Sequence, residues 1–141
     1  MIGLDTNVLA RYYVASADAP GKRQSLAAKQ LLESGKRLLV SKTVVLELEW
    51  VLRGYYKSPP AEVQAVYAHL LSLPNVEVED RPAVELAVAA LAQGFDFADA
   101  LHHASYRQCT SVATFDARSF ARRAQAASWK PRVDLLKDSA I

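Results

Sequence analysis

Four acidic residues have mainly apolar sequence neighbours, which suggests a functional role for their carboxylates rather than a place on a charged surface. They are Asp5, Glu47, Asp99 and Asp116. Four carboxylates within a few ångströms would repel one another strongly without a cation among them. Hard oxygen ligands without histidine or cysteine select Mg²⁺ or Mn²⁺ rather than zinc. If the fold gathers these acids, we therefore expect a Mg²⁺ site that also accepts Mn²⁺.

Two of these acids directly follow apolar segments with the character of short strands. Asp5 follows residues 1–4, and Asp116 follows residues 111–114 through Phe115. Ligands of open α/β sheets gather outside the carboxyl ends of the strands, so this placement favours a site there. The alternative is that each aspartate simply caps the helix that follows it, which is a favoured role for this residue.

The helix expected over residues 42–55 carries two acids in different settings. Unpaired acids are rarely buried without a partner or a metal, and the neighbours of Glu47 one turn away offer no charge partner. Glu49 has Arg53 four residues on, in the favourable orientation for a surface pair. We therefore predict that Glu47 faces the interior and that Glu49 lies on the surface. The neighbours of Glu47 are Thr43, Val44, Trp50 and Val51.

Asp96 and Asp99 stand at the beginning of another expected helix. Asp96 is predicted to cap it, with Asp99 in the first turn, where the helix dipole alone also favours an acid. The adjacent His102 and His103 point in different directions and cannot both bind one ion. We expect both histidines to be structural or surface residues.

Composition limits the class of protein. The chain has 141 residues, 51% hydrophobic and 23% charged, with a formal net charge of +2, which predicts one globular domain over residues 1–141. Residues 101–141 hold seven Lys or Arg against three Asp, which suits a polyanionic partner or a solvated helix face. A single cysteine, Cys109, fits a reducing compartment, and no segment has the pattern of a membrane span or a signal peptide. We expect a cytoplasmic protein with no membrane partner.

Strand-like and helical segments alternate along the chain. This order predicts an α/β fold, a three-layer α/β/α domain with a short parallel sheet of four or five strands. The expected strands are residues 1–4, 37–40, 76–78 and 111–114, with Val133 in a last edge strand, and the expected helices are residues 8–14, 22–33, 42–55, 61–73, 81–92, 97–107 and 117–127.

Four segments, in this order and spacing, resemble the PIN-domain ribonucleases, in particular the VapC toxins of prokaryotic toxin–antitoxin pairs. The segments are residues 4–9, 45–52, 97–101 and 114–116. The resemblance covers nearly the whole chain and assigns the family's acidic quartet to Asp5, Glu47, Asp99 and Asp116. It also matches Asp96 to an additional acid, and Thr6, Asn7 and Thr114 to supporting polar positions.

The resemblance implies a metal-dependent endoribonuclease with a PIN-like fold. Asp5, Glu47 and Asp99 would hold one or two Mg²⁺ or Mn²⁺ ions, and Asp116 would complete a second site or orient the attacking water. It also implies RNA as substrate, a cognate antitoxin lying across the active-site groove, and a homodimer. Trp50, Tyr55 and Tyr56 are candidates for the dimer contact or for core packing, and Arg11, Arg118 and Arg122 for contacts with the RNA backbone.

Two other classes of function remain as alternatives. One is a catalytically silent RNA- or protein-binding PIN-like module, against which the intact quartet argues. The other is a phospho-aspartyl enzyme or receiver that uses Asp5 as nucleophile. It is disfavoured because no acid stands two residues after Asp5 and no strand ends in a clear lysine partner.

Overall fold

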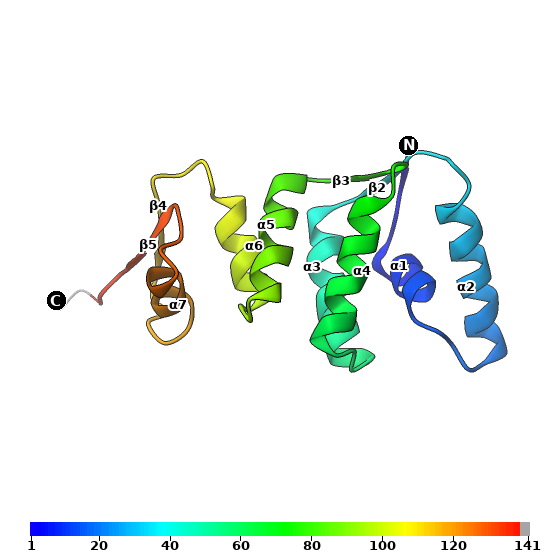
Figure 1. Cartoon of the computed structure of the whole chain (residues 1–141), viewed down its shortest axis with the longest axis horizontal. Helices are drawn as coiled ribbons and strands as arrows, with labels where there is room; N and C mark the ends of the chain where they lie inside the picture. The colour runs from blue at the N-terminus through cyan, green and yellow to red at the C-terminus, as the bar shows by residue number, and fades with distance from the viewer. Residues whose placement is uncertain (139–141) are drawn as a thin grey trace.

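The computed structural model describes residues 1–138, in which helices and short strands alternate (Figure 1). Among these residues, no helix combines the length and the apolar character that a membrane crossing needs. The elements in chain order are β1 (Ile2–Gly3), α1 (Thr6–Tyr13), α2 (Ala19–Leu32), β2 (Leu38–Val40), α3 (Lys42–Trp50), the π-helical turn η1 (Val51–Tyr55), α4 (Pro60–Ser72), β3 (Val76–Val78), α5 (Arg81–Ala92), α6 (Phe97–Ser105), β4 (Ser111–Thr114), α7 (Phe120–Ala126) and β5 (Arg132–Leu135).

All strand pairings are parallel, and they form two sheets. The first has the order β1-β2-β3, with Ile2 opposite Leu38 and Leu38 opposite Val76. The second joins β4 to β5, with Ser111 opposite Arg132. The α/β class with parallel strands is confirmed. The expected single sheet is corrected to a three-stranded and a two-stranded one, because β4 pairs with β5 rather than extending the first sheet.

The main core lies between the first sheet and the helices around it. Leu38 and Val40 of β2 are fully buried, as are Val45 and Leu48 of α3. The buried Tyr67 of α4 donates from its hydroxyl to the Val45 carbonyl oxygen at 2.6 Å. Its ring also stacks on Phe97 of α6, with ring centroids 5.1 Å apart. These contacts hold α3, α4 and α6 together.

Residues 111–135, which we call the C-terminal unit, have a small core of their own, formed by Ala121, Ala124 and Val133. The unit is attached to α6 and to the end of α5. The buried His103 donates from Nε2 to the Pro131 carbonyl oxygen at 2.6 Å, and its ring lies 4.7 Å from that of Trp129. Arg123 donates from Nη1 to the Gly94 carbonyl oxygen at 3.0 Å. His103 is therefore structural, as predicted.

Polar side chains set where the helices begin. Asp5, Ser41 and Asp96 cap α1, α3 and α6, and the predicted cap at Asp96 is confirmed. Helix α2 begins earlier than predicted because Asp18 caps it and the proline that follows is tolerated in a first turn. Helix α7 begins later, at Phe120, because the side chain of Asp116 binds the backbone of the preceding turn.

Asp80 links three parts of the main body. It follows β3 with a left-handed backbone, at φ 52°, which Asp and Asn tolerate better than most residues. Its carboxylate accepts from Lys42 Nζ at 2.8 Å, at the start of α3, and pairs with Arg107 Nη1 at 2.7 Å, just beyond α6. The hydrogen bond from Lys42 lowers the pKa of Asp80 below its usual value, and the charge of Arg107 contributes.

Replacing Asp80 by asparagine keeps the backbone preference and removes the charge. We expect D80N to lower the free energy of unfolding at neutral pH by about 1–2 kcal/mol, because two cations lose a partly buried partner. The folded-state pKa is depressed, so this stability is full above the unfolded pKa and is lost as the pH falls through the folded pKa. Urea unfolding from neutral pH to about pH 3 should show the wild type converging on D80N.

Glu77→Gln, at an exposed carboxyl on β3, is the matched control and should not show this convergence. A D80N difference that stayed constant across the pH series would contradict the role assigned to the Asp80 ion pairs.

Candidate active site

Asp5 stands where β1 ends and α1 begins. Leu4 is buried beside it, and the Thr6 N–H donates to Asp5 Oδ1 at 2.9 Å. The cap anticipated for Asp5 is therefore present, and the carboxyl remains exposed. The hydroxyl of Thr6 is buried, and none of the residues that the structure describes offers it a hydrogen-bond partner.

A groove of about 770 Å³, which we call the α1–α3 groove, joins Asp5 to Glu47. Residues from the start of α1 form one side of it, and residues of α3 and η1 form the other. The structure thus brings together the predicted site residues Asp5, Thr6, Asn7 and Glu47. Other lining residues are Arg11, Gln24, Trp50, Tyr55 and Tyr56.

The predicted burial of Glu47 and the predicted exposure of Glu49 are both wrong. Glu47 is exposed in the groove, whereas Glu49 is 5% exposed and accepts from Arg53 Nε at 2.9 Å. The predicted pair of Glu49 with Arg53 exists, but its carboxylate is buried. The apolar neighbours of Glu47 suggested that this side of the helix faces the core. Trp50, however, is 62% exposed and lines the groove.

A second set of acids lies at the start of α6. The Asp99 N–H donates to Asp96 Oδ1 at 3.0 Å, as expected for a helix cap. Burial raises the pKa of Asp99 above its usual value, and the negative charges of Asp96 and Asp116 raise it further, against the positive charges of His102 and Arg123. The contact of Arg123 with the Gly94 carbonyl oxygen holds the C-terminal unit, which carries Asp116, against the segment that leads into α6. Asp96, Asp99 and Asp116 therefore form one group.

Asp116 shapes the turn between β4 and α7. Its carboxylate accepts from the backbone N–H groups of Arg118 and Ser119, both at 3.1 Å, and from the Ser119 hydroxyl at 2.8 Å. The Ser119 bonds are the main reason that the pKa of Asp116 lies below its usual value. Thr114 supports the turn, because its hydroxyl accepts from the Asp116 N–H at 3.0 Å.

The acidic quartet is thus divided between two places in one copy of the chain. Glu47 and Glu49 are two residues apart on a helix and point about 200° from each other. Glu49 is buried, and its carboxylate accepts a hydrogen bond from Arg53. Glu47 must then face the other way. Within residues 1–138, no three acidic, histidine or cysteine side chains lie close enough to hold one metal ion.

The carboxylates of one copy therefore do not fit the metal site that the sequence predicts. Asp5 and Glu47 form one half, which we call the groove pair, and Asp96, Asp99 and Asp116 form the other, which we call the α6 group.

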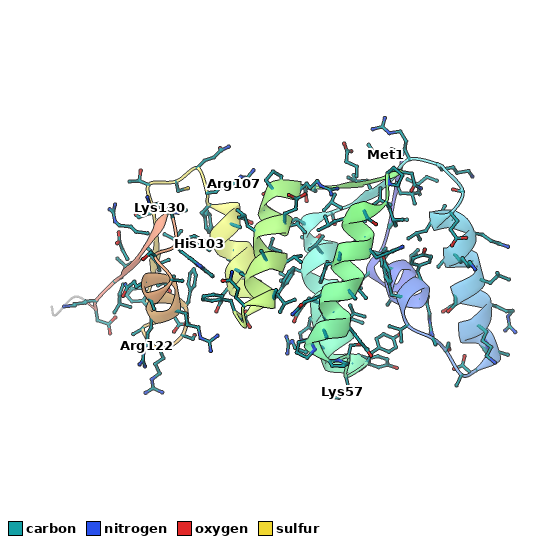
Figure 2. All side chains as sticks on the ribbon, viewed as in Figure 1. Met1, Lys57, His103, Arg107, Arg122 and Lys130 are labelled. Carbon is teal, nitrogen blue, oxygen red and sulfur yellow. The ribbon has the colours of Figure 1, made fainter. Side chains whose placement is uncertain are left out.

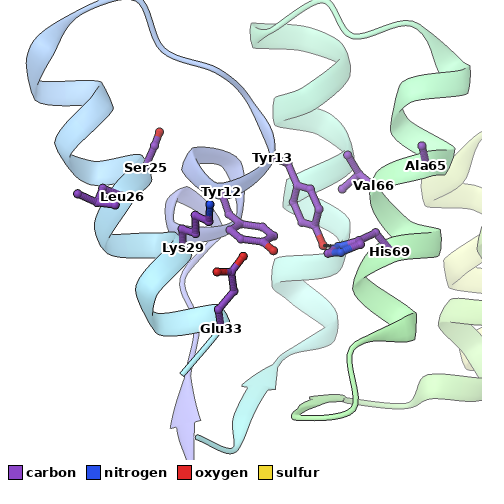
Figure 3. A pocket seen from close by; sticks show the side chains of 9 residues that line it. All are labelled: Tyr12, Tyr13, Ser25, Leu26, Lys29, Glu33, Ala65, Val66 and His69. Atoms are coloured by element: carbon purple, nitrogen blue, oxygen red, sulfur yellow. Dashed lines mark hydrogen bonds between the residues drawn. The ribbon is translucent and has the colours of Figure 1, made fainter. Parts of the chain in front are cut away.

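A separate hollow lies between α1, α2 and α4 (Figure 3). Tyr12 and Tyr13 point into it, and the Tyr13 hydroxyl lies 2.8 Å from His69 Nδ1. Burial raises the pKa of Tyr13, so its hydroxyl stays protonated across the physiological range. Glu33 alone among its lining residues is acidic, so this hollow does not compete with the groove for the acidic site. Sequence reasoning missed it because its residues come from three separate helices.

The family model for the PIN domain matches residues 2–126. The chain belongs to the PIN-domain family. The matched range contains Asp5, Glu47, Asp99 and Asp116, so the resemblance seen in the sequence is confirmed at the level of the family. A comparison with curated proteins finds no match. PIN domains are generally nucleases and typically use divalent metal ions, which places this chain among nuclease-type hydrolases.

The two glutamates of α3 provide a matched test of the site geometry. Glu49→Gln should lower the free energy of unfolding by about 1–3 kcal/mol, because it leaves a buried hydrogen-bonding position with a weaker partner. Glu47→Gln should change it by no more than about 0.5 kcal/mol, as is usual for exposed positions. Chemical denaturation of both variants measures this difference. A larger loss in Glu47→Gln than in Glu49→Gln would contradict the burial described above.

Proposed function

We propose that this protein is an endoribonuclease that hydrolyses RNA phosphodiester bonds and depends on Mg²⁺, with Mn²⁺ as a substitute. The observation that carries the proposal is the groove pair, with Asp5 at the carboxyl end of a strand and Glu47 across the same groove, in a chain of the PIN-domain family. The proposal keeps Asp5, Glu47, Asp99 and Asp116 as ligands of the type that these ions prefer, although one copy of the described chain does not bring them together.

The walls of the α1–α3 groove suit a single-stranded or looped segment of RNA. Trp50 and Tyr55 are 62% and 76% exposed and line the groove beside Arg11. Bases of any sequence stack on exposed aromatic rings, and arginine contacts the phosphate backbone. We therefore assign Trp50 and Tyr55 to base stacking, in place of the dimer contact considered from the sequence. Arg118 and Arg122 of the C-terminal unit are proposed to hold flanking RNA.

We further propose a cytoplasmic toxin of a toxin–antitoxin pair, whose antitoxin covers the α1–α3 groove. This role is supported by the resemblance of the sequence motifs to VapC toxins. The second candidate, a catalytically silent binding module, is favoured by one observation, namely the separation of the quartet in one copy. The two candidates differ in whether RNA is cut.

Asp5→Asn and Asp18→Asn are a matched pair for testing activity. Both aspartates cap a helix, and asparagine caps as well, so both variants should stay folded. Asp5→Asn should lose about a hundredfold or more of the cleavage of a structured RNA pool, because a metal ligand contributes several kcal/mol to the barrier. Asp18→Asn should match the wild type, and EDTA should abolish cleavage by both active proteins.

Cleavage by Asp5→Asn at the wild-type rate would show that the groove pair is not the active site. Intact RNA that is still bound by the wild type, with Mg²⁺ or Mn²⁺ present, would favour the silent module.

Tyr55 and Tyr106 test the stacking role, since both tyrosines are exposed and only Tyr55 lines the groove. Tyr55→Ala should weaken binding of a short single-stranded RNA by about tenfold, the scale of one lost base stack. Tyr106→Ala should leave binding unchanged. Fluorescence anisotropy in EDTA measures affinity without cleavage, and equal affinities for the two variants would contradict the assignment.

A further inference from the structure

No strand among residues 1–138 pairs with the outer edge of β1. Ile2 and Leu4 donate from their N–H groups to the carbonyl oxygens of Arg37 and Leu39, both at 2.9 Å. Hydrogen bonds of successive residues in a strand alternate in direction, so the backbone groups of Gly3 point away from β2. Within the described residues β1 is the end strand of its sheet, and both Gly3 and Met1 are exposed. Such an edge is a template for another strand.

The C-terminal unit carries a second incomplete edge. Within the described chain, β4 pairs with β5 and with no other strand. A two-stranded sheet is marginal by itself, and parallel sheets usually extend further and are covered on both faces. Phe115, at the end of β4, is 65% exposed, and Leu135 and Leu136 of the neighbouring chain segment are also exposed. The unit therefore presents apolar surface and an open parallel edge together.

The two open edges of one copy lie apart. Helices α3 to α6 stand between β1 and the C-terminal unit, which occupies one end of the molecule (Figure 1). Met1 and the basic residues Arg122 and Lys130 lie correspondingly far apart in Figure 2. Contacts of His103 and Arg123 hold the unit on the α5–α6 side. In this arrangement, the strand that covers β1 must come from elsewhere.

Charge supports a second copy as its source. Residues 1–105 contain ten Lys or Arg and twelve Asp or Glu, whereas the C-terminal unit, residues 111–135, contains five Lys or Arg and two Asp. The C-terminal unit of one copy is thus attracted to the body of another. In a dimer with a two-fold axis this contact would form twice, because each copy would place its C-terminal unit against the body of the other.

We propose that two copies exchange strand edges, so that β4 of one copy pairs in parallel with β1 of the other. The resulting sheet has the order β3-β2-β1 from one chain, followed by β4-β5 from its partner. Asp5 follows β1 and Asp116 follows β4, and the carboxyl ends of neighbouring parallel strands meet at one edge. Asp116 and its neighbour Asp99 in one copy thereby join Asp5 and Glu47 of the other. Each copy contributes half of each acidic site.

This inference deepens the proposed function, and mixed variants test it through activity. Asp5→Asn and Asp116→Asn should each be inactive alone. When they are coexpressed, half of the dimers are mixed and each holds one intact site, so about a quarter of wild-type cleavage should return. Coexpressed Asp5→Asn and Glu47→Gln, which damage the same half, should stay inactive. Absence of restoration in the first mixture, with an active wild type, would overturn the proposal.

A second measurement does not depend on activity and so remains decisive if the wild type cuts no RNA. Gly3→Pro removes the outward N–H of β1, while Gly3→Ala retains it in open space. Light scattering should show dimers for the wild type and Gly3→Ala, and monomers with unchanged circular dichroism for Gly3→Pro. A monomeric wild type, or a dimeric Gly3→Pro, would overturn the exchange of edges.

Discussion

The parallel pairing of β1, β2 and β3 is the constraint on which the other features of the structure depend. Leu38 and Val40 of the central strand are fully buried, and each strand runs directly into a helix. Because β1 and β2 are parallel neighbours, α1 and α3 begin at the same edge of the sheet. Asp5 at one helix start and Glu47 in the other helix therefore face a common groove. The same pairing leaves the far side of β1 without a partner strand in the part of the chain that the structure describes.

The remaining acids lie elsewhere in one copy, because the contacts of His103 and Arg123 hold the C-terminal unit beside α6. Burial is the main cause of the raised pKa of Asp99, and the negative charges of Asp96 and Asp116 add to it. Bringing the carboxylates of Asp5 and Glu47 close to the α6 group would increase the electrostatic repulsion unless a cation lay among them. The buried carboxylate of Glu49, which pairs with Arg53, lies on the interior side of α3, and Glu47 lies on the opposite side, in the groove. A complete quartet therefore requires a second surface that carries Asp99 and Asp116 to the groove.

Local structure was largely predictable from the sequence. Helix α5 and strands β3 and β4 begin and end at the predicted residues, because alternation and helical spacing are local signals. The capping role of Asp96 was predictable for the same reason, because it depends only on neighbouring residues. The exposure of Glu47 and the burial of Glu49 could not be predicted from the sequence. An apolar stripe on a helix does not reveal whether it faces the core or a groove lined by Trp50.

The division into two sheets was also beyond local reasoning. Which edge a strand joins is decided by long-range contacts, here those of His103 with Pro131 and of Arg123 with Gly94. The sequence motif around Asp116 identifies a member of the quartet, but it does not say which copy of the chain that aspartate serves. The central claim is that the acidic site forms between two copies of the chain rather than within one.

Chemical cross-linking tests that claim most directly. A chain with Gly3→Cys, Ala113→Cys and Cys109→Ser carries one thiol on β1 and one on β4, and neighbouring strands lie about 4.8 Å apart. Treatment with a short bis-maleimide, whose span tolerates a shift in register, is followed by a denaturing gel. The exchange of edges predicts a covalent dimer. A cross-link confined to single chains, at monomer mass, would contradict it and place the whole acidic site within one copy.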